Sequence, residues 1–289
     1  MINLFLDPGY WAGATRMNGP QKLATNLIAS LNQEGIPYAL NEEKYKHNFI
    51  VQYDYRGYVK HSELTLENCF VGPQIWFFDS HVKHIQENPN FYNKIIVPSQ
   101  WTKDLPVNKF NFPEDKIAIW PVGIEVKEYE KNLKSIEYDC LIYFKRRSED
   151  ELAKVISFLE KNEMTYNIVR YGSYNQEELE GLCDKSAFCF LLNGTESQGI
   201  AVQEMMARDM PMLVWDVTEW NDQGSQWSLP ATSVPYWSDE CGVKFTDINQ
   251  IEYAFDDFCS KIYTPRKFVE KELSFKASVD KLMRIFNAS

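Results

Sequence analysis

The prediction of the fold rests on the stretch AFCFLLNGTESQGIAVQEMMARDMPMLVWD, residues 187–216. Its first apolar run, AFCFLL, predicts a buried strand, and QGIAVQEMMARDM predicts a helix after a short polar loop. PMLVWD predicts the next strand. A strand–helix–strand unit of this kind implies a parallel sheet, whose ligands bind beyond the carboxyl ends of the strands.

The same alternation continues on the N-terminal side of this stretch. DCLIYF and YNIVRYG predict strands, while SEDELAKVISFLEKN and NQEELEGLCDKS predict helices. Ser148 is the expected N-cap of the first of these helices, with Glu151 three residues later in a capping box. Near the start of the chain, INLFL predicts a strand, followed by a glycine-containing turn and a helix around KLATNLIASL that ends at Gly35. The sequence therefore predicts an α/β protein.

Two segments break the alternation. VKEYEKNLKSIE, residues 126–137, is polar and predicts a linker between two α/β domains. VTEWNDQGSQWSLPATSVPYWSDE, residues 217–240, has poor periodicity and predicts a long surface loop with exposed tryptophans, Trp220, Trp227 and Trp237.

Composition bounds the class of protein. The chain has 289 residues and a formal net charge of −11, which suggests two globular domains and argues against non-specific nucleic-acid binding. No apolar run reaches the roughly 20 residues that span a bilayer, and the start lacks the basic region of a signal peptide. The six cysteines form no CxxC pair, so we expect a reducing, cytoplasmic setting and no zinc site. The oligomeric state stays open.

A first candidate site lies in TESQGIAVQE. Glu196 falls on the loop after a strand, Gly199 lets a ligand approach the backbone, and the helix N-terminus offers N–H groups to a phosphate. Glu204, inside the helix, could accept both hydroxyls of a ribose. The alternative is that Glu196 only favours the helix dipole and that Glu204 lies on a solvated face.

A second candidate is the basic run Lys145-Arg146-Arg147, which follows the strand CLIYF at the same edge of the sheet. Lys145 and Arg147 would share one face if the strand persists. The alternative is a solvated turn.

Further candidates are weaker. Gly172 and Tyr174 follow the neighbouring strand and could meet a planar base. Asn18 and Gly19 precede a helix with Lys22 beside them, which again offers N–H groups to an anion. His81 follows a predicted strand and could face a cleft or lie on the surface.

At this point the sequence resembles a known family. Residues 172–216 look like the donor domain of glycosyltransferase family 4 and its relatives, with Glu196 and Glu204 as the Glu-x7-Glu element. VPSQWTKDL with WPVGIE, and NGPQKLATNLIASL, resemble parts of the family's first domain. The resemblance implies the GT-B fold, in which two Rossmann-like domains face each other across a cleft. It implies an N-terminal acceptor-side domain at 1–130, a donor-binding domain at 131–267, and a C-terminal helix at 268–289 that packs back on the first domain.

The resemblance also implies an activity: sugar transfer from a nucleotide-diphospho-sugar to a glycan or other acceptor, with retention and without a metal or other cofactor. Glu196 would bind the donor sugar and Glu204 the ribose. Lys145 and Arg147 would stabilise the leaving diphosphate, and His81 matches a histidine of the first domain. The donor would further meet Gly19, Gly172, Tyr174, Ser197, Gln198, Gly199 and Ile200.

This chain departs from the family pattern in two places. Asn18-Gly19 stands where the family has a Gly-Gly pair, and one compact basic run stands where it has separated Arg and Lys residues. Two alternatives therefore remain: a non-catalytic GT-B module that binds a glycan or partner, and a GT-B epimerase that acts on a nucleotide-sugar.

Overall fold

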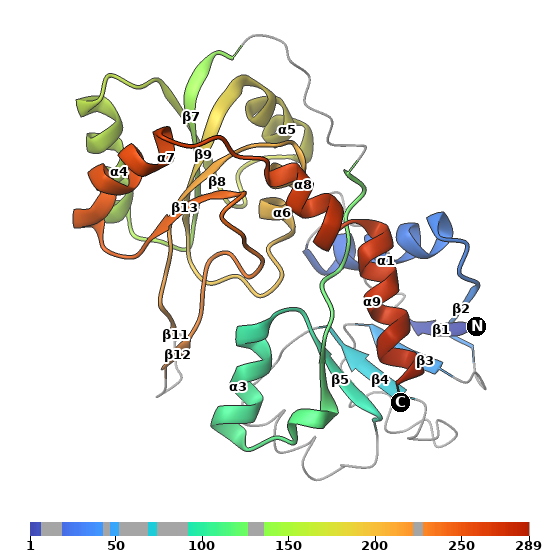
Figure 1. The fold of residues 1–289 in the computed structure, drawn as a ribbon. Coiled ribbons are helices and arrows are strands. Elements are labelled where there is room, and N and C mark those ends of the chain that lie inside the picture. The colour runs from blue at the N-terminus through green and yellow to red at the C-terminus, as the bar shows by residue number, and fades with distance from the viewer. Residues whose placement is uncertain are drawn as a thin grey trace. The chain divides into compact units, whose positions relative to one another are not determined.

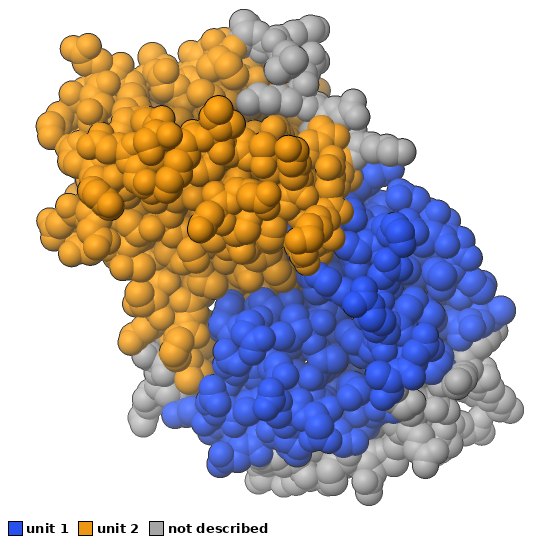
Figure 2. Space-filling model, viewed as in Figure 1, with its two compact units in different colours: residues 1–125, 273–289 blue, residues 126–272 orange. Residues whose placement is uncertain are grey.

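The structure is a computed structural model that describes residues 1–6, 19–42, 47–51, 69–73, 92–126, 136–221 and 228–288. It divides into two compact units, coloured separately in Figure 2: residues 1–125 with 273–289 form unit 1, and residues 126–272 form unit 2. The boundaries predicted from the sequence are 130 and 267. Within the described residues, no helix has the length and apolar character needed to cross a membrane.

Unit 1 is built on a six-stranded sheet with the strand order β2-β1-β3-β4-β5-β6, in which all neighbours are parallel (Figure 1). The strands are β1 (Ile2–Phe5), β2 (Tyr38–Leu40), β3 (His47–Val51), β4 (Cys69–Gly72), β5 (Lys94–Val97) and β6 (Ile117–Ile119). The helices of this unit are α1 (Gly19–Gln33), α3 (Gln100–Phe110), a 3-10 turn (Glu114–Lys116) and α9 (Phe275–Asn287).

The C-terminal helix α9 lies beside α1 in unit 1 (Figure 1). Its Phe286 is fully buried and meets the rings of Phe49 and Phe70 at centroid distances of 5.8 and 4.5 Å. The indole of Trp120 donates a hydrogen bond of 2.9 Å to the carbonyl of Ser278. Aromatic packing and buried hydrogen bonds thus join the last helix to the first unit.

Unit 2 has a five-stranded parallel sheet with the strand order β13-β10-β9-β7-β8. Its strands are β7 (Tyr138–Lys145), β8 (Tyr166–Arg170), β9 (Ser186–Asn193), β10 (Met212–Trp215) and β13 (Gly242–Phe245). Its helices are α4 (Glu149–Lys161), α5 (Gln176–Lys185), α6 (Ile200–Ala207), a 3-10 turn (Ile248–Gln250), α7 (Ile251–Cys259) and α8 (Pro265–Glu272).

The two faces of the unit 2 sheet differ in character. On one, which we call the α4 face, Phe144, Phe190 and Trp215 pack with side chains of α4 and α7 in an apolar cluster. Because side chains alternate along a strand, Tyr143 and Lys145 point to the opposite face, which we call the α5 face, since α5 contacts β7 and β9. The predicted capping box of α4 is confirmed: the Ser148 hydroxyl accepts a hydrogen bond from the Glu151 amide.

One prediction for unit 2 is wrong in part. The stretch 217–240 contains a short antiparallel hairpin, β11 (Glu219–Asn221) with β12 (Ser228–Pro230), rather than only a loop. Strands of three residues are too short to show a period in the sequence. Trp220 and Trp237 are half-buried instead of exposed, and Trp227 lies outside the described residues.

Candidate functional site

The centre of the candidate site is the pairing of Lys145 with Glu196. Lys145 ends β7, Asn193 ends β9, and the two face each other in the parallel register. Their side chains converge on one atom: Lys145 Nζ pairs with Glu196 Oε1, and Asn193 Nδ2 donates to the same oxygen over 3.0 Å. The side chains of Lys145 and Glu196 are only 11% and 12% exposed. The structure therefore brings two of the predicted site residues into direct contact.

Main-chain hydrogen bonds hold the loop that carries Glu196. The amide of Gly194 donates to the Lys145 carbonyl over 2.7 Å, and the amide of Glu196 donates to Thr232 over 3.0 Å. Gly199 is the N-cap of α6 and has φ 67°, a left-handed conformation that favours glycine. The loop thus ends at a helix N-terminus whose first N–H groups have no partner within the helix.

Two predicted residues of this loop have different environments. Ser197 is exposed, whereas Gln198 is buried and its carbonyl accepts a hydrogen bond of 2.8 Å from Gln203 Nε2. Ile200, the first residue of α6, is half-buried. Ser197 is therefore the residue of this loop whose side chain is most open to a ligand.

Asp216, which was not predicted as a site residue, stabilises the loop that carries Glu196 through hydrogen bonds with Thr232 and Ser233. Its carboxylate accepts hydrogen bonds from the Thr232 hydroxyl and from the amide and hydroxyl of Ser233, at 2.7–2.8 Å. Because Thr232 also accepts the Glu196 amide, Asp216 fixes the segment that positions Glu196. The only signal in the sequence is an acidic residue at the end of a predicted strand.

Glu204 is buried inside α6, with 4% of its surface exposed. Its Oε2 accepts a hydrogen bond of 3.1 Å from Nε2 of Gln176, in the first turn of α5. The alternative that Glu204 lies on a solvated face is therefore wrong. A buried carboxylate that accepts a hydrogen bond from a side-chain amide can instead accept hydrogen bonds from a hydroxylated ligand that displaces Gln176.

Arg147 does not share a face with Lys145. The strand ends at Lys145, and Arg146 has φ 54°, which turns the chain before the alternation can continue. Arg147 instead lies over the ring of Trp215, 4.7 Å from its centroid, on the α4 face. It donates to the Trp215 carbonyl over 3.1 Å and to Glu151 over 2.7 and 2.9 Å.

This environment gives Arg147 a structural role. Its side chain is only 8% exposed. Burial acts to raise the pKa of Glu151, but the hydrogen bonds from Arg147 and Ser148 outweigh it and hold that pKa below its ordinary value. The guanidinium also donates a hydrogen bond of 3.3 Å to the Asn193 carbonyl at the end of β9. It therefore stabilises the start of α4 and the ends of β9 and β10.

Arg146 contrasts with both neighbours. It is exposed, and within the part of the chain that the structure describes it forms no ion pair. Its backbone lies against the loop that carries Glu196, since a side chain built at Gly194 would come within 3.1 Å of the Arg146 carbonyl oxygen. A non-glycine residue with φ near 54° costs roughly 1 kcal/mol, and such strain concentrates at functional sites.

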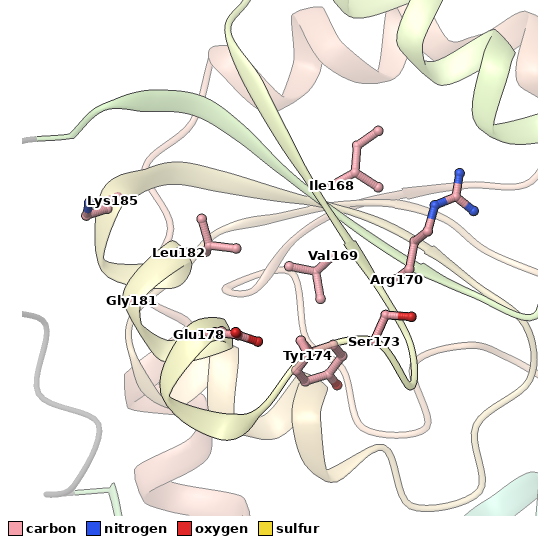
Figure 3. Close-up of a pocket in the computed structure, with 9 residues that line it drawn as sticks. All are labelled: Ile168, Val169, Arg170, Ser173, Tyr174, Glu178, Gly181, Leu182 and Lys185. Carbon is pink, nitrogen blue, oxygen red and sulfur yellow. The ribbon is translucent and has the colours of Figure 1, made fainter.

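The loop after β8 reaches the same region. Tyr174, a predicted site residue, has its hydroxyl 2.9 Å from that of Tyr143. Tyr171 lies under Lys145, whose Nζ is 4.3 Å from the ring centroid. Gly172 between them has φ 88°. A groove of about 570 Å³ runs from Ser173 and Tyr174 along α5 (Figure 3).

The remaining predicted residues belong to unit 1. Gly19 is the first residue of α1. His81 and Asn18 lie outside the described residues. In the described ranges, no group of three or more His, Cys, Asp or Glu residues is placed to hold a metal ion.

Comparison with solved structures shows the fold. The chain matches sucrose-phosphate synthase from Thermosynechococcus elongatus with a TM-score of 0.61 and 12% identity, over 100% of this chain and 99% of that one. It matches a glycosyltransferase from Rickettsia africae with a TM-score of 0.58 and 11% identity, over 99% and 97%. A variant of S. aureus TarM, in complex with fondaparinux, alpha-GlcNAc-glycerol and UDP, matches with a TM-score of 0.54 and 13% identity, over 92% and 59%. Neither a family model nor a curated protein sequence matches the chain.

These similarities, together with two parallel α/β units, define a GT-B fold. The GT-B prediction made from the sequence is confirmed.

Proposed function

We propose that this protein is a glycosyltransferase that moves a sugar from a nucleotide-diphospho-sugar to a glycan or another hydroxylated acceptor. The observation that carries the proposal is the convergence of Lys145, Asn193 and Glu196 beside the N-terminus of α6. Hydroxyl-accepting carboxylates and anion-binding N–H groups are the two chemistries that a nucleotide-sugar requires. The fold supports this assignment, because its solved neighbours include glycosyltransferases.

In the proposed reaction, the bond between the sugar C1 and the diphosphate oxygen breaks, a bond from C1 to the acceptor oxygen forms, and the proton of the acceptor hydroxyl passes to the departing diphosphate or to solvent. Glu196 accepts hydrogen bonds from hydroxyls of the donor sugar, and Glu204 accepts them from the ribose. The N–H groups of α6 and nearby cations stabilise the charge that develops on the leaving diphosphate. We propose that this arrangement works with retention and without a metal. We also propose that unit 1 binds the acceptor and that the protein is cytoplasmic.

Within the basic run 145–147, charge balance favours Arg146 as the cation for the diphosphate. A helix N-terminus supplies about half a positive charge, whereas a diphosphate brings about two negative ones. Lys145 and Arg147 are each paired with a glutamate, which neutralises most of their charge. We therefore propose Arg146 as the main diphosphate ligand, with Lys145 assisting once the donor sugar engages Glu196.

The test is a thermal-shift screen of the purified protein against UDP, GDP, ADP and their sugar conjugates, because a ligand raises the stability of the fold that binds it. UDP comes first, since the TarM neighbour was solved with UDP. The nucleotide-sugar that shifts the protein is then incubated alone and with oligosaccharide acceptors, and with or without EDTA. Transfer or slow donor hydrolysis supports the proposal. Binding without turnover indicates a non-catalytic module, a changed sugar indicates an epimerase, and no binding to any nucleotide refutes the proposal.

A further inference from the structure

Tyr143 places a hydroxyl in the interior of unit 2. It is the third residue from the end of β7 and is only 1% exposed. A buried tyrosine hydroxyl needs a hydrogen-bond partner. Here the partner is the hydroxyl of Tyr174, 2.9 Å away, and the two rings meet edge to face with centroids 6.1 Å apart.

Two side chains of β7 contact the two ends of the loop after β8. Tyr143 contacts Tyr174 at the end of the loop, and the ammonium of Lys145 lies over the ring of Tyr171 at its start. Tyr143 and Lys145 are two residues apart and therefore point to the same face of the sheet. Lys145 also pairs with Glu196, in the loop after β9.

The pKa of Tyr143 agrees with the proximity of Tyr174 and Glu196 to its hydroxyl. The pKa of Tyr143 is raised, first by burial, then by Tyr174, and also by the negative charge of Glu196. The negative charge of Glu196 therefore disfavours ionisation of the Tyr143 hydroxyl. This hydroxyl remains a neutral phenol that can donate and accept hydrogen bonds. Side chains near the end of β7 thus contact both loops: Tyr143 and Lys145 contact loop 171–174, and Lys145 pairs with Glu196 of loop 194–199.

We propose that Tyr143 is a positioning residue that fixes loop 171–174 relative to the Lys145–Glu196 pair. The inference rests on the proposed function: loop 171–174 lies at the nucleotide end of the donor site and loop 194–199 at the sugar end. Tyr143 holds loop 171–174 through Tyr174, and Lys145, two residues further on, joins this loop to Glu196, so that the two ends of a nucleotide-sugar are recognised together. It acts through Tyr174 and needs no contact with the donor.

The first arm of the test is amide hydrogen exchange on the protein without ligand, comparing wild type with Tyr143→Phe. The reporters are the amides of Ser173 and Glu196, which donate main-chain hydrogen bonds to Arg170 and Thr232. Loss of the buried hydroxyl pair should speed exchange in both loops roughly tenfold. The control is Tyr166→Phe on β8, whose hydroxyl bonds only over 3.1 Å to an exposed Glu160. Unchanged exchange in loop 194–199 of Tyr143→Phe overturns the positioning role.

The second arm measures UDP, GDP and ADP affinity by calorimetry for Tyr143→Phe, Tyr174→Phe and the double variant. Each single variant should weaken the bound nucleotide about tenfold, and the double variant should be no worse than either, because the two residues act as one unit. Affinity equal to wild type in Tyr143→Phe, or additive losses, overturns the inference. If wild type binds none of the three nucleotides, the proposed function fails, whereas hydrogen exchange alone then decides the role of Tyr143.

Discussion

Arg146 offers the sharpest prediction, because its two basic neighbours are already paired. Replacing Arg146 with Gln removes the one exposed cation of the run Lys145–Arg147 and disturbs no ion pair among the described residues. The backbone conformation at φ 54° suits Gln about as poorly as Arg, so the folded state should change little. The variant therefore tests ligand binding rather than folding.

The expected loss of diphosphate affinity follows from the hydrogen bond between Arg146 and the phosphate that the substitution removes. A hydrogen bond to a charged group contributes roughly 1.5–3 kcal/mol, and each 1.4 kcal/mol is a factor of about ten in affinity. Arg146→Gln should therefore weaken binding of UDP, or of whichever nucleoside diphosphate binds best, by about ten- to a hundredfold. Binding of the free nucleoside, which has no phosphate, should stay within about twofold, because only the phosphate contact is removed.

The assay is isothermal calorimetry with the nucleoside diphosphate and the nucleoside, at low and at moderate salt. Arg170→Gln is the matched control, because Arg170 ends the neighbouring strand but pairs at the surface with Glu149. Added salt should weaken diphosphate binding to wild type more than to Arg146→Gln. Diphosphate affinity that is unchanged in Arg146→Gln but lost in Lys145→Gln would refute the assignment of the diphosphate to Arg146.

Three further predictions concern the surrounding groups. Arg147→Ala should lower the free energy of unfolding by about 3 kcal/mol, measured by urea denaturation, since buried carbonyls and Glu151 lose a charged donor; a loss below about 1 kcal/mol would contradict the structural role of Arg147. The pKa of Glu151 is lowered in the folded state, so its stabilisation is present above the ordinary carboxyl value of 4.5 and is lost as the pH falls below it. The acid-induced decline of thermal stability should therefore be shallower in Arg147→Ala than in wild type, and equal slopes would exclude this contribution. Glu204→Gln should weaken nucleoside binding about tenfold or more in calorimetry, because a neutral amide accepts hydroxyl hydrogen bonds less strongly; equal affinities would place the ribose elsewhere.

Local patterns were sufficient to predict the fold and part of the site. Strand–helix alternation predicted the α/β class, and the start of α4 followed from Ser148 and Glu151, three residues apart. The position of Glu196, between the end of a strand and the start of a helix, also follows from the sequence alone. These features depend on residues that are close together in the chain.

Other features depend on a contact between distant residues or on an unusual backbone conformation, and the sequence did not reveal them. Tyr143 stands inside the apolar run CLIYF, and its partner Tyr174 is 31 residues away. The separation of Lys145 from Arg147 depends on the single left-handed residue between them, Arg146, a conformation that arginine rarely adopts. No periodicity in a sequence encodes such a turn.

The two faces of the unit 2 sheet differ in polarity at the ends of the strands, and this difference explains why the site lies on the α5 face. On the α4 face, aromatic and aliphatic side chains pack against one another up to the ends of the strands. The guanidinium of Arg147 lies over the ring of Trp215 at the end of this layer. On the α5 face the last residue pair of the sheet, Lys145 with Asn193, is polar and largely buried, and the ring of Tyr171 lies 4.3 Å from the Lys145 Nζ. Burying a polar group is costly unless it is hydrogen-bonded, and here Glu196 from the following loop pairs with Lys145 and accepts a hydrogen bond from Asn193 Nδ2. The buried Oδ1 of Asn193 has no partner among the described residues. The interaction that completes the folded sheet edge is thus the same one that we propose a donor sugar engages, so a variant such as Asn193→Ala should affect donor binding and local order of loop 194–199 together.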